Sequence, residues 1–307
     1  MAVVLLVGAF ALTRAVDNRY VYFASYVVLQ YIVLATAWNI LGGYTGYVNF
    51  GSAAFFAVGA YTTVFLYKAL HPPLPVMIAA GTLTAGLLGL GVGYLTLRMR
   101  GVYFAIATLA LAIVLFTFVV NWDYVGGARG AYILQPREVP FGFPRYVHLL
   151  YAVMALMAAL ALVVARAIGA SFIGRGLAAI RDDELAAECS GVPTLRLKLF
   201  SATVSGALMG MAGSTFPYYL SYVEPTAAFN LSYAVNSIAM PLVGGTMSWI
   251  GPVIGAVLLG AIQQIATVTI SSAANLLIVG VVLVAFVIIA PNGIIGLIET
   301  RLRKKAP

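Results

Sequence analysis

The stretch GRGLAAIRDDELAAECSGVPTLRLK, Gly174–Lys198, decides the topology of this chain because it is a long polar interruption in a very apolar sequence. It carries eight charged residues in 25 positions, whereas only 8% of the 307 residues are charged and 63% are hydrophobic. Ordinary globular chains have roughly a quarter charged residues. The rest of the sequence therefore has too few polar residues to cover a surface facing water, and most of it must face lipid.

Apolar segments of about 20 residues, the length that crosses a bilayer, recur on both sides of this stretch. The segment 1–13 has no basic residue before it, which is typical of a short first span and not of a signal peptide. The segment 48–68 includes the end of GGYTGYVNFG, which is typical of a broken or re-entrant start, and such irregular backbone needs protein or water around it. We predict an all-α fold, a polytopic membrane protein with about 8–10 transmembrane helices. The expected spans are 1–13, 21–41, 48–68, 75–97, 101–120, 146–169, 197–221, 229–247, 251–268 and 272–291.

The distribution of basic residues predicts the orientation, since cytoplasmic loops carry an excess of Lys and Arg. With Gly174–Lys198 inside and the spans alternating, eleven Lys and Arg fall inside and six outside, which accounts for all 17. This orientation places the N- and C-termini in the cytoplasm. The chain 1–307 then forms a single transmembrane domain with a cytoplasmic segment 170–198 and an external loop 121–145.

The sequence lacks the motifs of common enzymes. No lysine follows a glycine, so the chain has no P-loop, and no GxSxG is present. His71 and His148 have no partner at ligand spacing, which predicts no metal site, and the single Cys189 excludes an intramolecular disulfide. Ionisable residues are nearly absent from the spans, whereas ion-coupled carriers usually keep them at membrane depth. We expect a protein that is not an enzyme, has no cofactor and no nucleic-acid partner, and moves a neutral solute with energy from elsewhere.

The segment DDELAAECSGVP, 182–193, predicts a short helix with both ends marked. Asp182 is the expected N-cap, with Asp183 and Glu184 in the first turn, where the helix dipole favours negative charge. Gly191 suits the left-handed conformation at the C-terminus. A helix of about eight residues is too short to be stable alone in water. Two interpretations stay open: a soluble partner grips it, or it is a solvated loop that caps helix ends.

The segment RDDELAAECSG resembles the cytoplasmic loop of ABC importer permeases, whose pattern is Glu-x-Ala-Ala-Glu-x-x-Gly. Three further blocks occur in the order seen in the branched-chain amino acid permeases of the LivM-like group, and the resemblance covers about 21–297. These blocks are LGGYTGYVNFGSAAFFAVGAYT (41–62), RGVYFAIATLALA (100–112) and PLVGGTMSWIGPVIGA (241–256).

The resemblance implies a permease subunit in the cell (inner) membrane that imports branched-chain or other neutral amino acids. It implies two ATP-binding subunits, a homologous second permease and an extracytoplasmic substrate-binding protein as partners in the lipid bilayer. The ATPase contact would then include Asp182, Asp183, Glu184, Ala187, Glu188 and Gly191. Residues near the translocation path would include Tyr44, Thr45, Gly46, Asn49, Gly51 and Ser52.

The cargo stays open because Ser52 stands where this family commonly has histidine or glutamine. The alternatives are an ABC permease for urea, amides or another small solute such as a sugar, and a secondary carrier or channel that works alone. An intramembrane enzyme would need a catalytic pair at helical spacing, which the sequence lacks.

Polar and small residues within the spans carry two further expectations. The polar residues are more often interhelical hydrogen bonds of about 0.6 kcal/mol than groups lining a path; they are Asn39, Asn49, Thr108, Asn236 and Gln263. Small residues four apart predict close helix packing, in the segments 86–93, 206–210 and 251–255. A shared rhythm of glycines in 43–61 and 244–262 suggests an internal repeat of the kind found in transporters.

Overall fold

The computed structural model describes residues 19–136 and 145–269 continuously, together with residues 143, 277, 280, 281, 283, 284, 286 and 293–297. The predicted spans 1–13 and 272–291 lie outside the continuously described residues. Within the described part of the chain, the predicted all-α polytopic fold is confirmed. Five helices there are long and apolar enough to cross a membrane: Tyr20–Thr45, Leu74–Thr96, Val102–Val120, Tyr146–Ala170 and Thr194–Leu220, the last interrupted by a short break.

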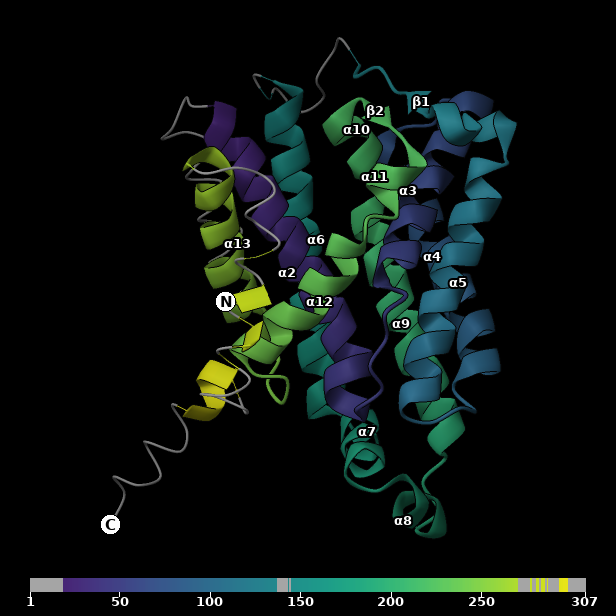
Figure 1. The fold of residues 1–307 in the computed structure, drawn as a ribbon, viewed down its shortest axis with the longest axis vertical. Helices are drawn as coiled ribbons and strands as arrows, with labels where there is room; N and C mark the ends of the chain where they lie inside the picture. The colour runs from purple at the N-terminus through teal and green to yellow at the C-terminus, as the bar shows by residue number, and fades with distance from the viewer. Residues whose placement is uncertain are drawn as a thin grey trace.

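The long helices run up and down a single bundle (Figure 1). They are α2 (Arg19–Thr45), α3 (Ser52–Ala69), α4 (Leu74–Thr96), α5 (Val102–Val120), α6 (Tyr146–Ala170), α9 (Thr194–Gly213) and α13 (Gly251–Thr269). The short helices α7 (Phe172–Asp182) and α8 (Glu184–Cys189) lie together at one end, called here the α8 end. At the opposite end, the β end, β1 (Ala131–Tyr132) pairs antiparallel with β2 (Tyr222–Val223).

The chain after α9 is broken into short helices. A break at Ser214–Thr215 precedes α10 (Phe216–Leu220), and α11 (Pro225–Ala228) and α12 (Leu231–Gly244) follow. At 14 residues and 1.5 Å per residue, α12 is about 21 Å long, whereas the hydrocarbon core is about 30 Å thick. The segment 229–247 therefore does not cross a membrane as one helix, which corrects that predicted span.

Glycines bring α9 against α4 and α3 at backbone distance. A Cβ on Gly210 would overlap the methyl group of Ala85, and one on Gly213 would overlap the backbone carbonyl of Phe56. The predicted packing role of the segments 86–93 and 206–210 is confirmed, because Gly89 meets the carbonyl of Ala202 in the same interface. Such close approach is expected of helices in lipid. No hydrophobic effect drives helices together there, so van der Waals contact has to stabilise their association.

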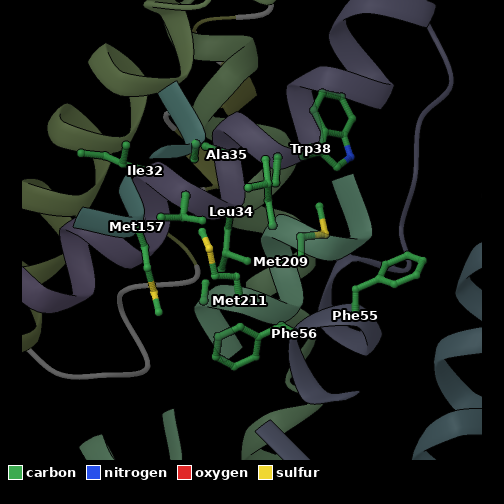
Figure 2. Packing of buried hydrophobic residues seen from close by; sticks show 14 of the residues in the cluster. Ile32, Leu34, Ala35, Trp38, Phe55, Phe56, Met157, Met209 and Met211 are labelled. Carbon is green, nitrogen blue, oxygen red and sulfur yellow. The ribbon is translucent and has the colours of Figure 1, made fainter. Parts of the chain in front are cut away.

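Helix α2 lies at the centre of the bundle and contacts α6, α9, α12 and α13. Figure 2 shows its side chains interleaved with those of neighbouring helices. They are Ile32, Leu34, Ala35 and Trp38 from α2, Phe55 and Phe56 from α3, Met157 from α6, and Met209 and Met211 from α9. This packed centre fixes the position of the C-terminal end of α2, where the chain leaves the helix close to α8.

Candidate functional site

The α8 helix begins one residue later than the sequence predicted. The N-cap is Asp183, whose carboxylate accepts hydrogen bonds from the backbone N–H groups of Leu185 (2.9 Å) and Ala186 (3.1 Å). Asp182 instead ends α7, and its carboxylate pairs with Arg181 at 3.3 Å. The reason is that the backbone is extended at Asp183 and separates the two helices there. The left-handed Gly191 (φ +85°) follows α8 as predicted.

The carboxylate of Glu184 points into the protein and forms the Glu184 cluster with Tyr47, Lys198 and Arg100. Its Oε1 accepts from Lys198 Nζ at 2.6 Å, and its Oε2 accepts from the Tyr47 hydroxyl at 2.6 Å. Lys198 Nζ also donates to the Tyr47 hydroxyl (3.1 Å) and to the backbone oxygen of Leu97 (3.0 Å). Arg100 Nε lies 3.6 Å from Glu184 Oε2. The cluster therefore joins four separate segments of the chain.

Two of the three charges in this cluster are largely removed from water, since the side chain of Lys198 is 4% exposed and that of Glu184 is 12% exposed, whereas that of Arg100 is 52% exposed. An ammonium group has three donors, and all three find an acceptor here: Glu184, Tyr47 and Leu97. Burial alone raises the pKa of Glu184, but the hydrogen bonds from Lys198 and Tyr47, with the charges of Lys198 and Arg100, outweigh it and hold the pKa below its ordinary value. Glu184 is therefore ionised at neutral pH.

The opposite face of α8 is open to solvent. Leu185 is 59% exposed, and Ala186, Cys189 and Ser190 are exposed beside it. Glu188 is exposed and accepts a hydrogen bond from the Thr194 hydroxyl at 2.6 Å. Sequence reasoning missed this exposed leucine. The signal in the sequence was that Leu185 lies two positions before Ala187, and residues two apart on a helix point in different directions.

The residues predicted for an ATPase contact fall into two groups. Glu184 points inward to its ion-pair partner Lys198, and Ala187 is buried, with 5% exposure. The others are on the outer surface: Asp182, Asp183, Glu188 and Gly191. The contact itself stays a prediction, and the structure gives its residues these two different surroundings.

The chain between α2 and α3, residues 46–51, is not helical and begins at Gly46, which has a left-handed backbone (φ +78°). It climbs beside α5 before α3 begins (Figure 1). The ring of Tyr47 packs on Phe104, and the N–H of Phe50 donates to the Thr108 hydroxyl at 3.1 Å, one turn further along α5. The predicted irregular start of this span is confirmed, and protein covers part of it, including Tyr47 and Asn49.

Side chains in this connection alternate between the interior and the surface. Tyr47 and Asn49 are buried, whereas Val48 is 39% exposed and Phe50 is partly exposed. The candidate path residues Tyr44, Thr45, Asn49 and Ser52 are all buried. Tyr44 donates to the carbonyl of Ala165, and Asn49 accepts from the N–H of Gly51.

Two pockets meet at Phe50, and of the candidate path residues Thr45 and Gly46 line the first of them. The first pocket, of about 580 Å³, lies at the α8 end, and its wall includes Thr45, Tyr47, Val48, Arg100, Arg181 and Glu184. The second, of about 480 Å³, lies between α5 and α11–α12, and its wall includes Leu109, Phe116, Phe229 and Asn230. Sequence reasoning missed Val48, Phe50 and Arg100; the alternation of the connection was the signal that could have found the first two.

Two of the polar residues expected to form interhelical hydrogen bonds, Asn236 and Gln263, do so. Gln263 of α13 donates to Asn236 of α12 at 2.8 Å, and Asn236 donates to the Tyr31 hydroxyl of α2 at 3.2 Å. Asn39 Oδ1 is buried without a partner among the described residues. Also within those residues, no group of three or more His, Cys, Asp or Glu side chains is placed to hold a metal ion.

Known proteins similar to this chain are transport permeases. LivM, the high-affinity branched-chain amino acid permease of Salmonella typhimurium, is 27% identical over 91% of this chain and 71% of its own length. The probable branched-chain amino acid permease LivH of Methanocaldococcus jannaschii is 25% identical over 85% of this chain and 86% of its own. The ribose import permease RbsC of Haemophilus influenzae is 35% identical over 30% of each chain. No solved structure matches the chain at a significant level.

The sequence pattern of one protein family covers nearly the whole chain, residues 20–287, and includes both the α2–α3 connection and α8. The match agrees with the resemblance seen in the sequence blocks. The chain belongs to the family of permease components of branched-chain amino acid transport systems.

Proposed function

We propose that this chain is the membrane subunit of an ABC importer, and that separate ATPase subunits drive it by docking on α8. The observation that carries the proposal is a short polar helix with an exposed apolar residue, Leu185, fixed to the bundle through the buried Glu184–Lys198 pair. A six-residue helix is not stable alone. Fixed in this way, it offers a soluble protein a firm surface and connects that surface to the membrane helices.

We further propose that the α8 end is cytoplasmic, so that transport runs from the β end towards α8. The basic residues support this orientation. At the α8 end they are Arg98, Arg100, Arg166, Arg175, Arg181, Arg196 and Lys198, whereas the described β end has Arg19, Lys68, Arg129 and Arg145. Cytoplasmic termini stay a prediction from the alternation of spans. An extracytoplasmic substrate-binding protein would meet the β end.

The proposed cargo is a branched-chain or other neutral amino acid, and the proposed path passes the two pockets on either side of Phe50. The second pocket is lined mainly by apolar side chains, which suits a neutral solute with an aliphatic side chain. The first pocket adds the charged Arg100, Arg181 and Glu184 at the α8 end. A homologous second permease would close the path on the side of α5, where Ile106, Ile113 and Val114 are about 60% exposed. The ribose permease relative keeps a sugar as the competing cargo.

Sidedness can be tested with the one cysteine of the chain, Cys189, which is exposed on α8. A membrane-impermeant maleimide should label inside-out vesicles from which the ATPase subunits have been stripped and not intact spheroplasts, with Cys189→Ser as the control for background. Labelling of spheroplasts alone would reverse the orientation and the proposed direction of transport.

The transport function can be tested in the native membrane. The chain should co-purify with an ATP-hydrolysing subunit and a second permease, and the reconstituted complex with its binding protein should take up leucine when ATP is supplied. Unlabelled isoleucine or valine should compete, and ribose or urea should not. Uptake by the chain alone, driven by an ion gradient, would replace this proposal with the carrier interpretation.

A further inference from the structure

Four segments of the chain meet at one buried ammonium group, that of Lys198 in the first turns of α9. Its partners are Glu184 of α8, Tyr47 of the α2–α3 connection and the backbone oxygen of Leu97 at the end of α4. We propose that Lys198 and Tyr47 are positioning residues that transmit movement of α8 to the α2–α3 connection, and so to the wall of the pocket at the α8 end. This inference rests on the proposed docking of an ATPase on α8.

The first step concerns how α8 is held. It has six residues, and Ala187 is its only buried side chain. Apart from its caps, its side-chain attachments to the rest of the protein are the bonds of Glu184 to Lys198 and Tyr47, the longer ion pair with Arg100, and the bond of Glu188 to Thr194. A partner that moves α8 relative to the bundle must therefore carry the Glu184 cluster along or separate it.

The second step concerns what lies on the other side of the cluster. Residues 47–50 of the connection form no helical backbone hydrogen bonds, so their position depends on side chains. Trp38 Nε1 donates to the carbonyl of Asn49 at 2.9 Å, and Thr108 accepts from Phe50. The hydroxyl of Tyr47 connects this segment to α8 through Glu184 and to α9 through Lys198. Backbone without regular structure yields more readily than a packed helix, so displacement of Glu184 acts on the connection first.

The third step concerns the consequence of moving the connection. Val48 and Phe50 flank the buried Asn49 and line the pocket at the α8 end, whose wall also includes Tyr47 and Glu184. Phe50 also lines the second pocket. A shift of Tyr47 by an ångström or so would thus change the wall between the two pockets. An ion pair suits this role because it is strong in a buried site and has discrete bonded and separated arrangements.

The competing explanation is that the cluster only holds the fold together. Transport per ATP hydrolysed, measured on the full complex in liposomes, separates the two. Lys198→Met should lower this ratio on the order of tenfold, the usual size of a coupling effect, while the ATPase still co-purifies. Tyr47→Phe removes a single hydroxyl, leaves the Glu184–Lys198 pair in place and should lower the ratio severalfold.

The matched control is Lys68→Met, the same substitution in a lysine at the β end that donates to the carbonyl of Tyr124. Its ratio should equal that of the unaltered complex. The exchange of charges in Glu184→Lys with Lys198→Glu should recover part of the ratio that Lys198→Met loses.

Three results decide the matter. A normal ratio in both Lys198→Met and Tyr47→Phe would overturn the transmission role. Equal loss of ATPase binding, hydrolysis and transport in both variants would assign the cluster to folding alone. If the unaltered chain does not bind an ATPase, the proposed function itself is wrong. ATPase binding by the unaltered chain is therefore measured before either variant is tested.

Discussion

The two ends of α9 are attached to the bundle in different ways. Its middle and C-terminal part meet α4 and α3 through Gly206, Gly210 and Gly213, with backbone against backbone. Its N-terminal part is held by the hydrogen bonds and ion pair of Lys198. Two backbones in direct contact cannot move closer together, whereas side chains in a hydrogen-bonded cluster can exchange partners. The comparison indicates that α9 is fixed at one end and able to respond at the other.

The largest effect should come from breaking the fixed end. Gly210→Leu places a side chain where Ala85 and the carbonyl of Gly81 already lie, and overpacking of this kind destabilises typically by 1–3 kcal/mol or more. We expect little monodisperse protein after purification in detergent. The control is Gly91→Leu on α4, where a Cβ meets nothing within 4 Å. Equal yields of the two variants would contradict the packing account.

The next effect should come from removing one charge at the responsive end. Glu184→Gln leaves the ammonium of Lys198, which is 4% exposed, without its counter-ion, at an expected cost of about 2–3 kcal/mol. Thermal unfolding of the purified protein measures it. An unchanged melting temperature would show that the pair contributes nothing to the stability of this end.

Acidification should give a smaller and graded version of the same effect. The pKa of Glu184 is lowered in the folded state, so its contribution to stability is present above the ordinary carboxyl range and is lost as the pH falls through the lowered pKa. The difference in melting temperature between the unaltered chain and Glu184→Gln should shrink from pH 7 towards pH 4 and below. A constant difference over that range would contradict an ionised Glu184.

The smallest effect on stability is expected on the outer face of α8. Leu185 is 59% exposed, so Leu185→Asp should change the free energy of unfolding by no more than about 0.5 kcal/mol. Co-purification of the ATPase should nevertheless be lost, because the substitution puts a charge into the proposed contact. Ser190→Asp, at the exposed C-cap that follows α8, shows whether any added charge has the same result.

The sequence predicted the parts of the fold that depend on local composition. Apolar runs located the helices, glycine spacing predicted close helix packing at 86–93 and 206–210, and Gly191 marked the end of α8. The short length of α12 was missed, because hydropathy does not reveal at which depth in the membrane a helix begins. The N-cap was misplaced by one residue, since two adjacent aspartates compete for that role.

The candidate site was harder to predict because its bonds join residues far apart in the chain. Glu184 looked like a surface residue of a polar helix, and only the fold brings Lys198 and Tyr47 to its carboxylate. Tyr44 and Asn49 belong to a recognisable block but make structural hydrogen bonds. Their neighbours Val48 and Phe50 line the pockets instead. Motifs thus located the right segments, whereas the division of roles within each segment required the three-dimensional contacts.

Protection of Cys189 tests the central claim most directly, namely that α8 is the surface on which an ATPase docks. Maleimide labelling would be measured on the native complex, and again after the ATPase subunits are stripped from the membranes and after they are added back. The account predicts slow labelling in the complex, fast labelling after stripping and slow labelling on reconstitution. Equal labelling in all three states, with the ATPase shown to be bound in the first and third, would contradict it.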